Sequence, residues 1–269
     1  MTKNCLGMRT SGEEIIIKTC ATNKNKKTMN DVTLEKMGQL RLFGMQASFK
    51  AIIESKTSEQ FTIDQLLATL VQAEWEDQEN RKIERLIKNA GFRYQSSLEE
   101  IDYSHPRNLD RNQLLRLVDC KYLERAENIL VTGATGLGKS YIISALGYQA
   151  CLMGYKVIYC NTQKLFNALK INKVDGSYIK EIKRIEKQDL LILDDFGLQP
   201  LDNISSLTLM EIIEDRFAKK SIIIGSQLPL EKWYDIIVEK TVADAILDRL
   251  LNASHKIILK GDSMRRKKR

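Results

Sequence analysis

The sequence is poor in the residues that build covalently linked or metal-held scaffolds. Its five cysteines are an odd number and include no C-x-x-C pair, and it contains only two histidines. A disulfide framework or a zinc site is therefore not expected. Only three residues are proline and 14 are glycine, which excludes a fibrous or low-complexity protein.

Long apolar runs are also missing. No segment approaches the roughly 18 apolar residues that cross a membrane, and the N-terminus lacks the apolar core of a signal peptide. We therefore expect a soluble, intracellular protein. Since 43% of the 269 residues are hydrophobic, the chain has enough apolar material for one mid-sized domain and a smaller one.

Acidic residues are outnumbered at both ends of the chain. Lysine and arginine exceed aspartate and glutamate by six to two in residues 1–30 and by 26 to 19 in residues 111–269, and the last five residues are all basic. Residues 31–110 have the reverse balance, with ten basic and 14 acidic residues. The net charge of +7 favours a polyanionic partner such as nucleic acid, and a solubilising surface is the alternative interpretation.

Residue patterning predicts four segments. Residues 1–30 are rich in Lys, Asn and Thr, which is typical of a disordered basic leader. Residues 31–95 show helical spacing of apolar residues and predict a small helical domain. Residues 96–112, which include Pro106, are expected to form a linker. Residues 113–269 alternate short apolar strands with helices and predict a second domain that ends in a basic tail.

Two local features refine the helical segment. Gly38 and Gly44 are expected to weaken the helix over residues 32–55. Thr62 and Gln65 have the spacing of a capping box and predict the start of the next helix.

The second domain is predicted to have an α/β fold. Its expected strands are continuously apolar, which implies a parallel sheet covered by helices on both faces. The expected strands are residues 128–132, 156–160, 190–195, 221–227 and 256–260, and the expected helices are residues 139–153, 162–171, 177–187, 206–218, 230–239 and 243–252.

The strongest motif is "GATGLGKS", which runs from Gly133 to Ser140. Its place after a strand and at the start of a helix suits a phosphate-binding loop, in which backbone N–H groups surround the phosphates. Lys139 is expected to reach the β- and γ-phosphates, and the Ser140 hydroxyl is expected to bind Mg²⁺. The predicted nucleotide contacts are Gly133, Ala134, Thr135, Gly136, Leu137, Gly138, Lys139, Ser140 and Tyr141.

Two adjacent carboxylates, Asp194 and Asp195, end the predicted strand 190–195. A carboxylate pair at the tip of a buried strand is costly unless it serves a cation. We expect Asp194 to bind Mg²⁺ and Asp195 to orient or deprotonate the attacking water. A helix-capping pair is the alternative interpretation.

Three further polar residues are candidates. Ser226 and Gln227 end the next strand, where either side chain would sense the γ-phosphate, although a strand-to-helix turn also explains them. Arg249 has apolar neighbours on the predicted helix 243–252, and taken alone it is typical of a salt-bridged surface arginine.

Motifs of other nucleotide-binding classes are incomplete. Residues 172–175 match the guanine motif N-K-x-D and residues 194–197 match D-x-x-G, but their order is the reverse of that in GTPases. The D-F-G at residues 195–197 has no accompanying H-R-D loop, which excludes a protein kinase. The sequence therefore predicts ATP rather than GTP as the nucleotide.

Four segments together resemble a known family, the insertion-sequence ATP-binding proteins, which form the IstB-like branch of the AAA+ ATPases. The segments are "NILVTGATGLGKSYIISALG", "LLILDDFG", "IIIGSQLPLEKW" and "ADAILDRLLNASHKIILKGDSMRR". The resemblance covers about residues 30–266, and the relatives nearest in plan are the DnaC-type helicase loaders. It implies an AAA+ P-loop domain over residues 113–269, after a small all-helical domain.

The resemblance also implies residue roles. Arg249 matches the arginine finger that reaches the ATP of the neighbouring subunit, and Arg265 matches the sensor-2 arginine. Ser226 or Gln227 occupies the sensor-1 position. Asp195 stands where most AAA+ proteins have glutamate, and the shorter side chain bears on the rate of hydrolysis rather than on ATP binding.

The resemblance implies partners as well. Proteins of this family are transposition helpers of the bacterial cytoplasm and nucleoid. They oligomerise with ATP on DNA, largely without sequence preference, and act with a cognate transposase in target-site selection and insertion. In the loader branch the segment after the second strand lines the nucleic-acid channel, and a solvated helix face is the alternative interpretation. The expected DNA contacts are Lys164, Lys170, Lys173, Lys183 and Arg184.

Two other functions remain open at this point. A replicative helicase loader shares the ATPase module. A protein scaffold that binds ATP without hydrolysing it is disfavoured, because Lys139, Asp194, Asp195 and Arg249 are all present.

Overall fold

The computed structural model describes residues 27–57 and 60–264. The chain divides into two compact units, and the division falls between Asp77 and Gln78. Most of the predicted leader and the predicted basic tail lie outside the described residues. None of the helices in the described part of the chain combines the length and the apolarity needed to span a membrane.

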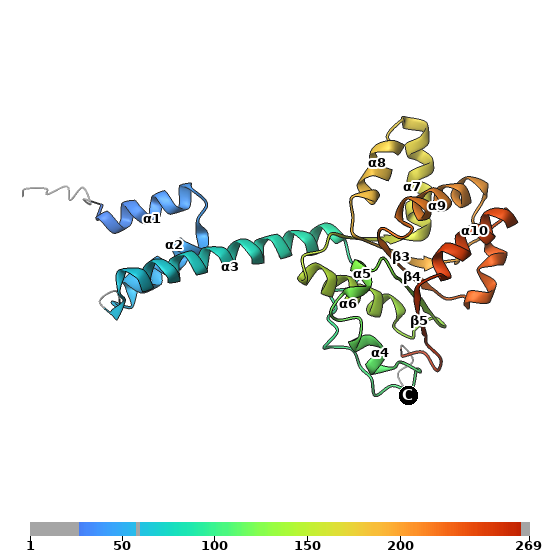
Figure 1. Cartoon of the computed structure of the whole chain (residues 1–269), viewed down its shortest axis with the longest axis horizontal. Helices are drawn as coiled ribbons and strands as arrows, with labels where there is room; N and C mark the ends of the chain where they lie inside the picture. Colours follow the sequence, from blue (N-terminus) through green and yellow to red (C-terminus); the bar gives the residue numbers. More distant parts are fainter. Residues whose placement is uncertain (1–26, 58–59, 265–269) are drawn as a thin grey trace, which may run out of the picture. The chain divides into compact units, whose positions relative to one another are not determined.

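The N-terminal unit is helical, as the patterning predicts (Figure 1). The predicted capping box is present, because Gln65 N donates to Thr62 Oγ1 at 3.3 Å and Thr62 N donates to Gln65 Oε1 at 3.0 Å. The helices are α1 (Met29–Gln39), α2 (Phe43–Glu54) and the first half of α3 (Ile63–Ala90).

Gly44 has a packing role that the sequence pattern does not reveal. A Cβ at Gly44 would lie 2.2 Å from the backbone oxygen of Ala73, so the close approach of α2 to α3 requires glycine. The buried Glu74 carboxylate accepts hydrogen bonds from Gly44 N at 3.0 Å and Met45 N at 3.2 Å. Glu74 thereby caps α2, which has no side-chain cap of its own.

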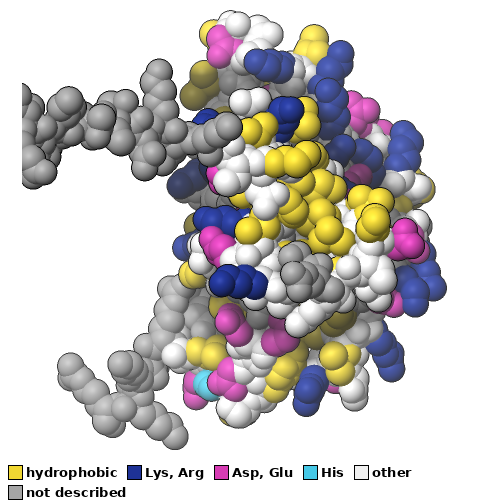
Figure 2. Space-filling model, turned by 90° about the vertical axis from the view of Figure 1, so that its left-hand side faces the viewer, with side chains coloured by type: hydrophobic (Ala, Val, Ile, Leu, Met, Phe, Trp, Pro, Cys, Tyr) yellow, Lys and Arg dark blue, Asp and Glu magenta, His cyan; other side chains and the backbone are white. Residues whose placement is uncertain are grey.

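One face of α3 in this unit carries exposed apolar side chains. Spacing of four residues places them along one side of the helix. Figure 2 shows the whole of one face of the molecule, on which hydrophobic side chains gather beside lysine and arginine side chains. The exposed large apolar side chains of this part of α3 are Ile63, Leu67, Val71 and Trp75.

The second unit has the predicted α/β architecture. Its five strands form one parallel sheet in the order β2-β3-β4-β1-β5. The strands are β1 (Asn128–Thr132), β2 (Val157–Asn161), β3 (Leu190–Phe196), β4 (Ser221–Ser226) and β5 (Ser254–Ile258).

Helices cover both faces of this sheet (Figure 1). The predicted helix over residues 230–239 is wrong, because two short 3-10 helices stand there. The helices are α4 (Arg111–Leu115), α5 (Lys121–Glu124), α6 (Lys139–Leu152), α7 (Thr162–Asp175), α8 (Tyr178–Glu186), α9 (Asn203–Arg216), η2 (Leu230–Lys232), η3 (Tyr234–Ile236) and α10 (Lys240–Leu251).

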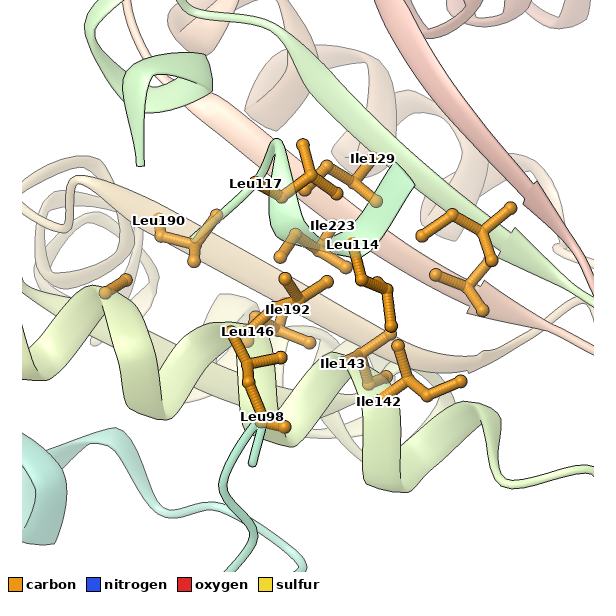
Figure 3. Close-up of a cluster of buried hydrophobic side chains, with 14 of the residues drawn as sticks. Leu98, Leu114, Leu117, Ile129, Ile142, Ile143, Leu146, Leu190, Ile192 and Ile223 are labelled. Atoms are coloured by element: carbon orange, nitrogen blue, oxygen red, sulfur yellow. The ribbon is translucent and has the colours of Figure 1, made fainter. Parts of the chain in front are cut away.

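Alternation along the strands separates two cores. Ile129 and Val131 of β1 belong to the core that contains α6, whereas Leu130 belongs to the core that contains α7 to α10. Figure 3 shows the first core, where Ile142 and Leu146 of α6 lie with residues of the strands. Each central strand is thus buried on both faces, as its continuous apolar sequence predicts.

Residues on both sides of the expected boundary at residue 95 pack on this first core. Leu86 and Ile87, near the end of α3, contact it. Leu98 and Ile101 are buried in it (Figure 3 shows Leu98), so the segment expected as a linker, residues 96–112, lies against α6. The end of α3 therefore belongs to the second unit, which explains why the division falls at residue 77.

Candidate functional site

The loop between β1 and α6 forms a cradle at the carboxyl edge of the sheet. Gly136 and Gly138 have φ angles of 88° and 86°, in the left-handed region that favours glycine. Gly138 caps α6 without a side-chain hydrogen bond, which leaves the first N–H groups of α6 available to an anion. Lys139 is buried, and its Nζ donates to the Ala134 backbone oxygen at 2.9 Å.

β3 places Asp194 and Asp195 at the same edge. Asp194 is 1% exposed, and its Oδ1 accepts a hydrogen bond from Asp195 N at 2.8 Å. The Tyr159 hydroxyl donates to Asp194 Oδ2, and burial together with this hydrogen bond raises the pKa of Tyr159. Asp195 has a φ of 56°, a strained conformation of the kind found at functional sites.

The oxygen donors at this edge fit a divalent cation that is bound together with phosphates. Ser140 and Asp194 would hold Mg²⁺, because hydroxyl and carboxylate oxygens are hard ligands. A Cβ at Gly225 of β4 would lie 2.8 Å from Asp194 Oδ1, so glycine leaves room for this carboxylate. Within residues 27–57 and 60–264, no group of three Asp, Glu, His or Cys side chains forms a metal site by itself. Mg²⁺ is commonly bound by one or two protein oxygens together with phosphate oxygens and water.

The end of β4 distinguishes the two sensor candidates. Ser226 is fully buried, and its Oγ donates to Phe196 O at 2.8 Å and accepts from Leu228 N at 3.1 Å. Its hydroxyl is thus engaged in holding the turn. Gln227 Oε1 accepts a hydrogen bond from Thr135 Oγ1 at 2.6 Å, so Gln227 reaches the phosphate-binding loop.

An open cleft of about 590 Å³ joins most of these groups, which is within the size range of ligand pockets. Its walls include Gly138, Lys139 and Ser140 of the loop, Asp195 of β3 and Gln227 after β4. The structure thus brings together predicted residues that are separated widely in the sequence.

Arg107 is a residue of this cleft that the sequence pattern missed. It is 3% exposed, and its guanidinium donates to Leu137 O at 2.8 Å and to Asp102 O at 2.7 Å. Burial lowers the pKa of Arg107. The side chain fastens the expected linker to the phosphate-binding loop, and no motif marks it in the sequence.

The last described residues also cover the loop. Met264 N donates to Gly136 O at 3.0 Å, and a Cβ at Gly136 would lie 2.0 Å from Ser263 Oγ. The predicted sensor-2 residue, Arg265, follows directly but lies outside the described residues.

Arg93 is a second residue that the sequence pattern missed. Its Nη1 lies 3.1 Å from Asp195 Oδ2 and 3.7 Å from Asp194 Oδ2. Asn161 Nδ2 donates to the same Asp195 oxygen at 3.0 Å. Two donors from different elements therefore hold the carboxylate of Asp195.

Arg249 lies at the amino edge of the sheet, away from the cleft of its own chain. The side chain of Asn128, the first residue of β1, donates to the Arg249 backbone oxygen at 3.4 Å, whereas the phosphate-binding loop follows the last residue of β1. A strand of this length spans roughly 13 to 17 Å. Arg249 Nε pairs with Glu214 at 2.6 Å, and its guanidinium lies 5.7 Å from the centre of the Phe217 ring.

A groove of about 170 Å³ adjoins Arg249. Arg125, Arg216 and Lys220 also line it. Arg216 is buried and its guanidinium is engaged with backbone oxygens, so Arg125 and Lys220 are the other basic side chains that this edge presents beside Arg249.

The predicted DNA-contacting residues divide into two groups. Lys164 of α7 and Lys183 of α8 are exposed, and neither has a side-chain partner within the part of the chain that the structure describes. The other three are engaged locally: Lys170 pairs with Asp202 at 2.7 Å, Lys173 donates to Thr208 Oγ1 at 3.1 Å, and Arg184 pairs with Glu181.

Comparison with known proteins places this geometry in a family context. Residues 35–269 match the family described as IstB-like ATP binding protein. The chain is 38% identical over 237 residues to an insertion sequence ATP-binding protein of Sinorhizobium fredii, and the match covers 88% of this chain and 97% of that protein. It is 36% identical over 202 residues to an insertion sequence ATP-binding protein of Pseudomonas fluorescens, and this match covers 75% of this chain and 87% of that protein.

A solved structure supports the fold. The crystal structure of DnaI superposes with a TM-score of 0.52 at 19% identity and covers 66% of this chain and 94% of that chain. At this identity the likeness concerns the fold alone. The parallel sheet with helices on both faces is the α/β architecture that the sequence predicts, and it agrees with the AAA+ P-loop fold that the family resemblance implies.

Proposed function

Because the chain belongs to the IstB-like family of ATP-binding proteins, we propose that it is the ATP-hydrolysing helper of a bacterial insertion sequence. It binds ATP with Mg²⁺, oligomerises on DNA in the cytoplasm, and acts with a cognate transposase in target-site selection. The observation that carries the proposal is that the cleft and Arg249 occupy opposite edges of one sheet.

The cleft of one chain supplies most of the groups that hydrolysis needs. The loop and Lys139 surround and neutralise the phosphates. Mg²⁺, when bound by Ser140 and Asp194, neutralises charge on the transferring phosphoryl group. Asp195 orients the attacking water and accepts its proton, and Gln227 reports the presence of the γ-phosphate to the end of β4.

The group that we propose the neighbouring subunit to supply is a cation on the far side of the γ-phosphate. In a head-to-tail assembly, the amino edge of one sheet faces the cleft of the next subunit. Arg249 would then enter the neighbouring site, where an arginine accelerates phosphoryl transfer by about 10³ to 10⁵. Hydrolysis therefore depends on assembly, which suits a timed step in transposition.

A mixing experiment tests this arrangement. Lys139→Ala removes phosphate binding but keeps Arg249, whereas Arg249→Ala keeps the cleft. Each variant alone is expected to lose most DNA-dependent ATP hydrolysis. An equimolar mixture is expected to recover about a quarter of the wild-type rate per subunit if head-to-tail neighbours combine at random.

Lys240→Ala is the matched control, since Lys240 is an exposed cation on the same helix as Arg249. It is expected to hydrolyse ATP like the wild type. No recovery in the mixture, with both variants folded and bound to DNA, would show that Arg249 does not act between subunits.

DNA contact is tested separately. Replacing Lys164 and Lys183 together by alanine should weaken DNA binding and reduce the slope of log affinity against log salt by about two. Lys121→Ala, on the short helix α5, is the control. An unchanged slope would remove both lysines from the DNA interface.

The partner decides between transposition and helicase loading. A pull-down with the cognate transposase and with the replicative helicase, each at matched concentration and with ATP present, separates the two functions. We expect retention of the transposase.

A further inference from the structure

The two carboxylates at the end of β3 share one arginine as their counter-ion. Arg93 lies within 3.7 Å of both Asp194 and Asp195. The side chains of the acids are 1% and 20% exposed, whereas that of Arg93 is 46% exposed. The guanidinium therefore stands at the mouth of the cleft and can turn into solvent without becoming a buried, unpaired charge.

The backbone beside Arg93 is fixed by packing. Phe92 lies so close to α6 that a Cβ at Gly147 would be 2.6 Å from its ring. The same ring meets that of Tyr159 edge-on, with the ring centroids 6.4 Å apart, and the Tyr159 hydroxyl donates to Asp194. Phe92, the neighbour of Arg93, is thus held in place beside Tyr159 and Asp194. Arg93 can therefore leave the two carboxylates by movement of its side chain alone.

A divalent cation held by Asp194 would stand close to this guanidinium. Two positive charges at such a separation repel one another strongly in a partly buried site. Arg93 and a metal ion would therefore compete for the same carboxylates.

We propose that Arg93 is a positioning residue that occupies the place of the cation at Asp194 and Asp195 until Mg²⁺ arrives with ATP. This inference rests on the proposed function, since it takes Asp194 as the metal-binding carboxylate. Arg93 holds both acids in place in the nucleotide-free chain and opposes the binding of a metal ion without nucleotide. The phosphates supply the additional ligands and charge that displace it.

The test measures metal binding to the nucleotide-free full-length protein, with Mn²⁺ alone as the probe and electron paramagnetic resonance of free Mn²⁺ as the readout. Arg93→Gln is expected to bind Mn²⁺ about tenfold more tightly than the wild type, because an opposing charge is removed. Arg93→Lys keeps that charge and is expected to remain close to the wild type. Arg85→Gln, which removes an exposed arginine from α3, is the charge-matched control and is expected to leave the affinity unchanged.

Two outcomes overturn the inference. One is an equal Mn²⁺ affinity of folded Arg93→Gln and the wild type. The other does not depend on any variant: a crystal structure of the wild type with Mg²⁺ and a non-hydrolysable ATP analogue in which Arg93 still lies within 4 Å of Asp194.

The proposed ATPase function fails in a different way. A wild type without DNA-dependent ATP hydrolysis, whose Mn²⁺ affinity nevertheless rises on Arg93→Gln, would refute the ATPase function and keep the exchange between Arg93 and the metal ion.

Discussion

Replacement of Arg216 by methionine is expected to destabilise the second unit severely. Arg216, the last residue of α9, is 1% exposed and carries a charge into the interior. Its guanidinium donates to four backbone oxygens, those of Ile185 at 3.2 Å, Gln188 at 3.0 Å, Asp189 at 3.0 Å and Ser221 at 2.9 Å. These oxygens belong to the end of α8, the loop before β3 and the start of β4. One side chain therefore ties α9 to the end of α8, to the loop before β3 and to the start of β4.

The expected magnitude follows from two opposing effects. Hydrogen bonds from a charged donor contribute about 1.5 to 3 kcal/mol each, and burying the ion costs several kcal/mol. The same burial lowers the pKa of Arg216 to about 10. Methionine fills much of the volume but has no donor, so the four oxygens lose this partner. Each buried acceptor that is left without a donor costs about 1 to 3 kcal/mol, and removal of the ion recovers several kcal/mol of desolvation. We therefore expect a net decrease of about 3 to 5 kcal/mol in the free energy of unfolding.

Urea unfolding of the full chain measures this decrease. For a slope near 2 kcal/mol per molar, the midpoint of the second unit should fall by about 2 M. Lys219→Met is the control, because Lys219 is an exposed neighbour whose replacement should change stability by no more than about 0.5 kcal/mol. Arg216→Lys should recover only part of the loss, since the three lysine donors leave from a single atom. A midpoint of Arg216→Met equal to that of the control would refute the reasoning.

Three further predictions concern other parts of the chain. Gly44→Ala should destabilise the N-terminal unit by about 1 to 3 kcal/mol, because the added methyl group would meet a backbone oxygen of α3 at 2.2 Å; an unchanged thermal midpoint of that unit would contradict this. Asp202→Ala should cost about 1 kcal/mol at pH 7, since Asp202 caps α9. The pKa of Asp202 is lowered to about 2, chiefly by its hydrogen bond from Lys170, so the difference between wild type and variant should persist above about pH 4 and disappear as the pH falls towards 2; denaturant titrations at several pH values measure it. Burial raises the pKa of Cys120 to about 11, that of Cys151 to about 12 and that of Cys160 to about 11. Iodoacetamide at pH 8 should therefore modify these thiols only after unfolding, and mass spectrometry counts the modified thiols.

The sequence predicts those parts of the cleft that are formed by residues adjacent in the chain. The phosphate-binding loop requires glycines at fixed spacing beside Lys139, and the acids Asp194 and Asp195 lie at the end of an apolar strand. Both patterns are local, so they can be recognised from the sequence alone. Arg93 carries no such pattern, because it stands 102 residues from Asp195 and reaches it only through the packing of the chain.

The boundary between the two units, after Asp77, is also difficult to predict from the sequence. The helical spacing of Leu86 and Ile87 shows that α3 has an apolar face, but not which core that face joins. One continuous helix contributes to both units, so its end gives no boundary. Long-range packing also decides the structure of residues 230–239. Trp233 is fully buried there, and its Nε1 donates to Leu228 O at 3.2 Å. The segment forms two short 3-10 helices around this residue instead of the predicted helix.

β1 connects the two halves of the proposed intersubunit site. Its last residue leads into the phosphate-binding loop. At its first residue, Asn128 Oδ1 accepts from Ile222 N at 2.9 Å, and Asn128 Nδ2 donates to the backbone oxygens of Arg249 and Leu250 at 3.4 and 3.3 Å. A central strand held on both sides has little freedom to lengthen or bend. The distance from the cleft of one chain to Arg249 of the same chain is therefore nearly fixed. In the proposed assembly, Arg249 would enter or leave the next cleft by rotation of whole subunits, and each rotation would change the geometry of two neighbouring sites.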